Sequence, residues 1–148
     1  MVMSRGPKGE PGMVRIKRAY EARGPCEGHR VLVDRLWPRG VRKEELSPDE
    51  WLRDLSPSDE LRHWFGHDPA RWSEFRSRYR RELAHGPARE ALRHLVERAQ
   101  AGPVTLLYGA RDEEHNNAVV LQEMIDARLR RARSPQAAPR RDPCRPAG

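Results

Sequence analysis

Three stretches of the chain carry the hydrophobic patterns of β-strands. Residues 14–20 alternate apolar and polar positions, which is typical of a half-buried strand. Residues 29–35 and 104–108 have continuous apolar centres instead, and such centres suit strands of a parallel sheet that is covered on both faces. The chain therefore begins its ordered part with two strands and adds a third after a long interval.

Helical spacing and capping signals predict five helices between and after these strands. The first signal is Ser47-Pro48-Asp49-Glu50, a capping box with Ser at the N-cap, Pro at the first helical position and Glu at the third. The second helix begins at Ser56-Pro57-Ser58-Asp59 and ends before Gly66, and the third begins at Asp68-Pro69 and ends at Gly86. The fourth helix ends at Gly102-Pro103, and the fifth begins at Asp112.

This order of elements predicts a compact, single-domain α/β sandwich. We expect a small, mostly parallel sheet with Rossmann-like or flavodoxin-like layering, covered by helices. Strands 29–35 and 104–108 are joined through helices and should be parallel, so their carboxyl ends lie on the edge where open α/β sheets bind ligands. Residues 35–40 and 108–116, about 70 residues apart in the sequence, should therefore meet in space.

The positive charge is concentrated toward the two ends of the chain. The formal net charge is +7; residues 1–13 carry +1 and residues 131–148 carry +4, which leaves +2 for residues 14–130. We expect a flexible N-terminal extension over 1–13, one α/β domain over 14–130 and a disordered, Pro/Arg-rich tail over 131–148. The basic tail favours weak, salt-sensitive attraction to nucleic acid, whereas the domain itself is not strongly basic.

The segment after the second predicted strand carries the strongest chemical signal. Arg35 and Arg39 would clamp an anion, Trp37 would supply a stacking wall, and Gly40 would let the backbone approach a ligand closely. In the alternative, Arg35 pairs with Asp34 or another acid, the tryptophan plugs the end of the core, and the rest is an ordinary turn.

The turn after the third predicted strand supplies a second set of candidates. Gly109 and Arg111 lie at the expected start of the last helix, where free backbone N–H groups can cradle an anion. His115, expected in the first helical turn, and Tyr108 are candidate catalytic residues that would handle protons, and Asn116 is a candidate ligand contact. The alternative is a helix cap whose histidine and asparagine face solvent.

Other polar and aromatic groups favour structural roles. The aromatic residues at helical spacing are expected in the core, and the arginines of residues 76–81 either form a solvated face interlaced with Glu74 and Glu82 or a patch for phosphate backbones. Since no Cys/His ligand spacing is present, we expect no metal, and nothing indicates a cofactor. No stretch approaches the ~20 apolar residues of a membrane span, so a cytoplasmic protein without a membrane partner is expected.

Two segments resemble a bacterial family known as a domain of unknown function, number 488, and specifically its short YeaO-like branch. The likeness covers about residues 14–130; it is carried by residues 30–40, by Leu61-Arg62, Phe75-Arg76, Tyr79 and Glu82-Leu83, and by residues 105–112 and 115–118. It implies a compact α/β fold with a pocket shared by the two loops, and it implies no activity or cofactor. Longer relatives carry a cysteine near the position of Tyr108, so thiol chemistry is not implied for this chain.

The first functional hypothesis is a pocket for a small anionic ligand, phosphorylated or nucleotide-like, at the carboxyl edge of the sheet. If the protein is an enzyme, hydrolysis or group transfer is the expected class. The alternatives are a nucleic-acid-binding module that uses Arg39, residues 76–81 and the basic tail, and a non-catalytic protein whose Trp37 loop contacts a partner protein. Neither catalysis nor an oligomeric state follows from the sequence.

Overall fold

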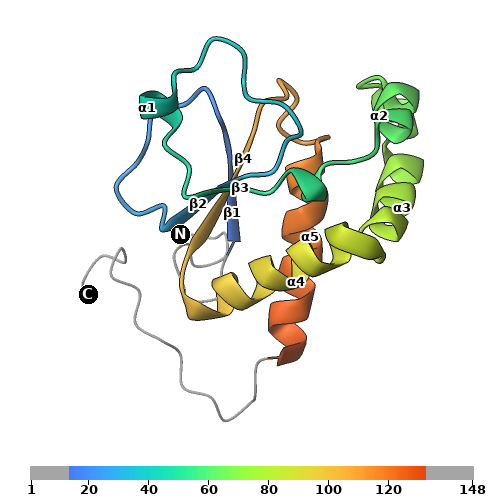
Figure 1. Cartoon of the computed structure of the whole chain (residues 1–148). Helices are drawn as coiled ribbons and strands as arrows, with labels where there is room; N and C mark the ends of the chain where they lie inside the picture. Colours follow the sequence, from blue (N-terminus) through green and yellow to red (C-terminus); the bar gives the residue numbers. More distant parts are fainter. Residues whose placement is uncertain (1–13, 133–148) are drawn as a thin grey trace, which may run out of the picture.

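The computed structural model describes residues 14–132, so the extension expected over residues 1–13 and most of the expected basic tail lie outside the described residues. The strands β1 (Val14–Arg18), β2 (His29–Leu32), β3 (Glu50–Trp51) and β4 (Val104–Tyr108) form a sheet in the order β1-β4-β2-β3, and the described pairs are all parallel. This arrangement confirms the predicted α/β fold with a small parallel sheet (Figure 1).

Strand β4 is the centre of the sheet. It pairs with β1 from Val14↔Val104 to Arg18↔Tyr108 and with β2 on its other side, and its five residues are all buried. The continuous apolar run that predicted this strand therefore reflects a position covered on both faces. Strands β2 and β4 end on the same edge, as their predicted parallel order requires.

The prediction of a helix that starts at the capping box of Ser47 is wrong. Ser47 instead ends the short helix α1 (Lys43–Leu46) in a left-handed conformation with φ 45°. The backbone N–H of Asp49 then donates to the carbonyl of Arg30 at 2.8 Å, and the next two residues pair with β2 as the edge strand β3. The sheet satisfies these backbone groups, so the local helix signal is overridden.

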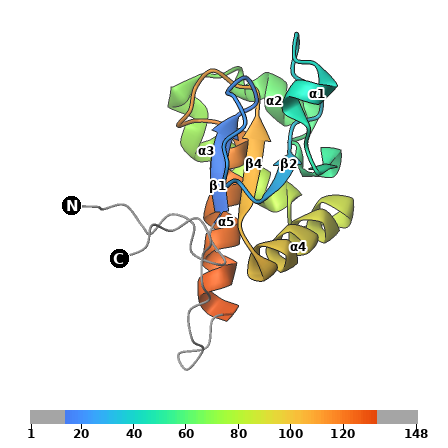
Figure 2. The same ribbon diagram turned by 90° about the vertical axis from the view of Figure 1, so that its left-hand side faces the viewer.

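Four helices lie on one side of the sheet, as Figures 1 and 2 show: α2 (Asp59–Phe65), α3 (Trp72–Glu82), α4 (Gly86–Ala101) and α5 (Asn117–Ala132). Helix α5 packs directly on β1 and β4, and α2 and α3 lie beyond it. The apolar sides of the four helices pack with inward-facing residues of the strands and form the larger of two hydrophobic clusters. The predicted limits of α2 are confirmed, because Ser58 Oγ accepts from the backbone N–H of Leu61 at 3.1 Å and Gly66 closes the helix at φ 52°.

Two predicted helix boundaries are wrong. Gly86, with φ 61°, opens α4 instead of ending α3, which stops at Glu82. Asn116, and not Asp112, caps α5, since Asn116 Oδ1 accepts from the backbone N–H of Val119 at 3.1 Å. The shift to a later start leaves a longer loop between β4 and α5 than the sequence pattern indicates.

Chain connections and the four-residue helix α1 cover the other face of the sheet, so the expected covering by helices applies fully to one face. A smaller hydrophobic cluster lies there, formed by Ala19, Leu32, Leu46 and Leu107. The connection between β1 and β2 crosses this face and ends at Gly28, whose φ is 70°. A Cβ on this glycine would lie 2.3 Å from the carbonyl oxygen of Pro103, so the close approach requires glycine.

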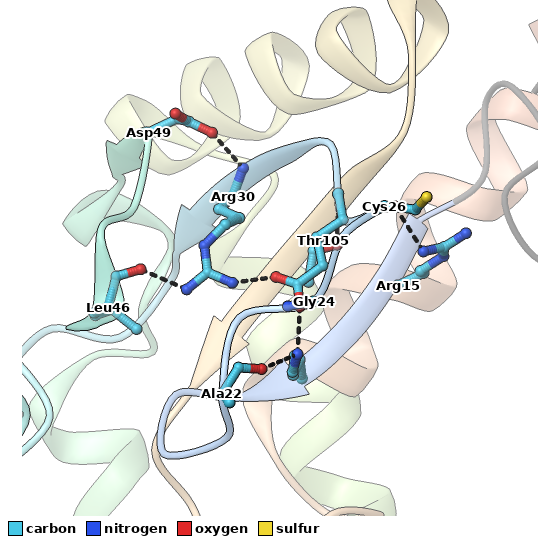
Figure 3. A network of polar contacts seen from close by, with 10 residues as sticks. Arg15, Ala22, Gly24, Cys26, Arg30, Leu46, Asp49 and Thr105 are labelled. Atoms are coloured by element: carbon cyan, nitrogen blue, oxygen red, sulfur yellow. Dashed lines mark hydrogen bonds and ion pairs between the residues drawn. The ribbon is translucent and has the colours of Figure 1, made fainter. Parts of the chain in front are cut away.

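A polar network ties the same connection to the sheet. The guanidinium of Arg30 donates to Glu27 and to the carbonyl of Leu46, and Lys17 donates to the same carboxylate. Figure 3 shows Arg30 with its contact to Leu46 and with Thr105 from β4 nearby. Thr105 Oγ1 donates to the backbone carbonyl of Glu27 at 2.7 Å. Within residues 14–132, no helix is long and apolar enough to cross a membrane.

Candidate functional site

A cavity of about 290 Å³ lies at the carboxyl edge of the sheet, where β2 and β4 end. Asp34, Arg35 and Leu36 line it from the end of β2. Gly109, Ala110 and residues 115–117 line it from the loop after β4. The two strand-end segments therefore meet, as the parallel order predicts.

Asp34 joins the two segments directly. Its Oδ2 accepts from the backbone N–H of Gly109 at 2.8 Å, and its Oδ1 accepts from the side-chain amide of Asn117 at 3.1 Å. The same amide donates to the carbonyl of Val33 at 3.1 Å, which holds the start of α5 against the end of β2. Burial raises the pKa of Asp34 above its ordinary value, and the two hydrogen bonds only partly offset burial.

Two arginines on the cavity wall share one acid. Arg35 Nη1 lies 3.3 Å from Asp59 Oδ1, and Arg62 Nη2 lies 3.0 Å from the same oxygen. The hydrogen bond from Arg62 and the charge of Arg35 lower the pKa of Asp59. The side chains of both arginines are about half exposed, at 48% and 46%. Exposed ion pairs contribute little free energy, so an anion entering the cavity can compete for both guanidinium groups.

His115 lies on the cavity wall with its ring held from two sides. Its Nδ1 lies 2.8 Å from Asp112 Oδ2, and its ring meets that of Trp72 edge-to-face at 5.2 Å. Asp112 Oδ1 also accepts from the backbone N–H groups of Glu114 and His115, and together these bonds lower the pKa of Asp112. This contact orients the ring, and in a tautomer that donates from Nδ1 to Asp112, Nε2 is left as an acceptor. The predicted place of His115 in a first helical turn is wrong, because α5 begins two residues later.

Tyr108 and Asn116 have structural surroundings. Tyr108 is 2% exposed within the larger hydrophobic cluster, and burial raises its pKa, which disfavours its use as a base near neutral pH. Asn116 is 3% exposed; besides capping α5 it donates to the carbonyl of Asp112 at 2.8 Å. Asn116 borders the cavity, whereas Tyr108 is absent from the described lining.

The segment around Trp37 lies off the cavity. Trp37 is half-buried on the sheet face opposite α2–α5, where its ring meets that of Trp51 edge-to-face at 5.5 Å and its Nε1 donates to the carbonyl of Val41 at 2.6 Å. Gly40 has φ 82° with open space around its Cα, so this glycine serves a turn. Arg39 and Arg111 are exposed, and among the described residues Trp37, Arg39, Gly40 and Arg111 do not line the cavity. Their predicted contacts with a ligand stay predictions.

The sequence reading missed the wall that α2 and α3 supply. Arg62, Phe65, His67 and Phe75 line the cavity, and the rings of the two phenylalanines stack with centroids 4.4 Å apart. One signal was available, because Leu61-Arg62 and Phe75-Arg76 belong to the segments that carry the family resemblance. The sequence indicates Asp34 only as an acid that could pair with Arg35, although it is the first polar residue after a buried run.

Three arginines of α3 pair with acids, but only Glu74 is an acid that the sequence pattern indicates as a partner. Arg76 and Arg80 both contact Glu123 of α5, at 2.8 and 3.1 Å, and Arg78 pairs with Glu74. Glu82, the other predicted partner, instead accepts from the backbone and hydroxyl of Ser58. Two glutamates thus pair with three of these arginines, so the charge of this face is only partly balanced.

Comparisons with known proteins identify relatives along most of the chain. A family model described as "Inactive DUF488-N3 subclade" matches residues 13–144, farther toward the C-terminus than the resemblance at residues 14–130. The uncharacterized protein Rv3073c of Mycobacterium tuberculosis is 43% identical over 115 residues, which cover 78% of this chain and 95% of the relative. The uncharacterized protein YeaO of Escherichia coli is 38% identical over 112 residues, 76% of this chain and 96% of the relative. No solved structure is significantly similar.

Proposed function

The chain belongs to the family of the domain of unknown function 488, and we propose that it binds a small anionic ligand, phosphorylated or nucleotide-like, in the cavity at the carboxyl edge of the sheet. The observation that carries the proposal is the placement of Arg35 and Arg62 on the wall of this cavity. A guanidinium presents a planar set of donors that matches phosphate and carboxylate oxygens.

The surroundings of the two arginines support this proposal. Asp59, their common partner, is exposed and does not line the cavity among the described residues, so it holds the arginines in position without filling the space between the strand ends. His115 adds an oriented imidazole on the same wall. A volume of about 290 Å³ lies at the lower limit of ligand pockets, which favours a small ligand over a dinucleotide.

Binding without turnover is the form of the proposal that we favour. The description of the matching subclade as inactive supports it. Tyr108, one of the two proton-handling candidates, is buried in the core with a raised pKa. Hydrolysis or group transfer would require His115 to act with the Asp112 carboxylate that orients it, and we expect no product when the bound ligand is incubated with the protein.

The experiment that tests the proposal is calorimetric titration of the full chain with inorganic phosphate, ribose 5-phosphate and nucleoside monophosphates. Arg62→Ala should weaken binding about tenfold or more, the usual loss for a hydrogen bond to a charged group. Arg39→Ala is the matched control, because Arg39 is also an exposed arginine but lies off the cavity.

Two results would contradict the cavity assignment. One is a wild-type protein that binds none of these anions. The other is a loss of affinity in Arg39→Ala with Arg62→Ala unchanged, which would move the anion from the cavity to Arg39.

A further inference from the structure

The carboxylate of Asp34 keeps acceptor capacity beyond the hydrogen bonds that it makes within the fold. Among the described residues, each of its oxygens accepts one hydrogen bond, from Gly109 and from Asn117. A carboxylate offers about four acceptor positions, so about two are left for a ligand. Asp34 also belongs to the cavity lining. A group that enters the cavity can therefore reach an ionised oxygen that the fold has not fully used.

The charge of Asp34 is not neutralised by direct contact with a cation. Its two partners within residues 14–132 are neutral amides, and Arg62 acts on it only through space while it pairs with Asp59. A second anionic group of a ligand would be repelled at this place. A hydrogen-bond donor, either a hydroxyl or an N–H, is the group that Asp34 can recognise.

The cavity thus contains two kinds of recognition group and an apolar wall between α2 and α3. Arg35 and Arg62 suit an anion, Asp34 suits a donor, and the stacked rings of Phe65 and Phe75 suit the flat or apolar part of a ligand. Both kinds of polar group line a cavity of about 290 Å³, so one small molecule can contact both at once.

We infer that the ligand is a phosphomonoester that also carries a hydroxyl or N–H donor, as sugar phosphates and nucleoside monophosphates do, and that Asp34 selects it over a simple phosphate. This inference rests on the proposed function, since it needs the anion to bind at Arg35 and Arg62. It adds a specificity-determining residue and a second chemical requirement on the ligand.

The test compares ribose 5-phosphate, guanosine monophosphate and methyl phosphate, which shares the phosphomonoester but has no donor beyond the phosphate itself. The wild-type full chain should bind at least one of the two larger ligands about tenfold or more tightly than methyl phosphate. Asp34→Asn should remove most of that preference without weakening the binding of methyl phosphate, because the substitution removes a negative charge from the cavity wall. Equal affinity of the first two ligands identifies a sugar hydroxyl as the donor, and tighter binding of the nucleotide identifies the base.

Two outcomes overturn the inference: a wild-type protein that binds methyl phosphate as tightly as the larger ligands, or an undiminished preference in Asp34→Asn. Should Asp34→Asn fail to fold, the affinity ratio of the wild type is followed while the pH is lowered. Protonation of Asp34 should reduce the ratio, and a constant ratio down to the pH of acid unfolding overturns the inference. Failure of the proposed function is distinct, because then even methyl phosphate does not bind and Arg62→Ala changes nothing.

Discussion

Two carboxylates that folding withdraws from water meet opposite surroundings. Glu27, 7% exposed, lies on the face of the sheet that the chain connections cover. Burial raises its pKa, but the hydrogen bonds from Lys17, the backbone N–H of Gly24 and Arg30 outweigh burial and hold the pKa below its ordinary value. In the network of Figure 3 two cations, Lys17 and Arg30, bind this carboxylate.

Asp34, at the carboxyl edge of the sheet, has no cation as a direct partner among the described residues. Its donors Gly109 and Asn117 are neutral, and burial leaves its pKa above the ordinary value. The Glu27 side uses charge to fix a loop on the sheet, whereas the Asp34 side keeps charge in contact with a cavity. A perturbed carboxylate in a cavity is typical of a functional site, and a paired carboxylate under a loop is typical of a structural one.

The largest loss of stability should follow from breaking the buried ion pair between Arg30 and Glu27. Arg30→Ala leaves Glu27 without its buried partner and should lower the free energy of unfolding by about 3–5 kcal/mol, the usual loss when a buried ion pair is broken. Arg62→Ala removes an exposed ion pair at the cavity and should lower it by less than about 1 kcal/mol. Urea denaturation of both variants measures the difference, and equal losses would contradict the contrast between the two sides.

The pH dependence of stability should separate the two carboxylates by sign. Glu27, with a lowered pKa, adds stability above the ordinary pKa of glutamate, and this stability is lost as the pH falls through the lowered value. Asp34, with a raised pKa, opposes folding when ionised, so its contribution becomes more favourable as the pH falls through the raised value. Relative to the wild type, Glu27→Gln should lose less stability on acidification and Asp34→Asn should lose more.

Denaturation of these two variants over a series of acidic pH values provides the measurement. The comparison uses the slope against pH and not the stability at a single pH, because each substitution also removes hydrogen bonds. Slopes that change in the same direction in both variants would show that the two sides of the sheet do not differ as described.

A smaller effect than that of Arg30→Ala concerns the helix that borders the cavity. Asn116→Ala removes the side chain that caps α5 and should lower the free energy of unfolding by about 1 kcal/mol, while Asn116→Ser should retain most of the stability. Thermal denaturation of the two variants measures the cap. If Asn116→Ser loses as much stability as Asn116→Ala, the bond to the Asp112 carbonyl and not the cap carries the contribution.

Much of the fold could be predicted because its signals are local. The run at residues 104–108 and the limits of α2 at Ser58 and Gly66 depend on residues close in sequence. The edge strand β3 could not be predicted, since its two residues are fixed by pairing with β2. The capping box at Ser47 shows the same competition, in which a valid local signal lost to a distant partner.

The same distinction separates the residues of the candidate site that the sequence predicts from those that it does not. Arg35, Gly109, His115 and Asn116 were predicted to lie near one another because parallel strands bring their ends to one edge. Arg62 was missed, since the docking of α2 against that edge depends on packing that leaves no pattern in the sequence. Trp37 was predicted in the site because Arg35 and Arg39 lie close to it in the sequence, whereas its ring packs against Trp51.

The pairing of β1 with β4 has a consequence for how the protein is made. Val14 pairs with Val104, so about 90 further residues must be synthesised after the first strand before its partner strand exists. Contacts of such sequence separation form slowly, and the apolar residues of β1 and β2 stay uncovered on the ribosome until β4 emerges. Nascent chains that stop before residue 104 should therefore be the ones that chaperones hold, and release should coincide with the appearance of the central strand.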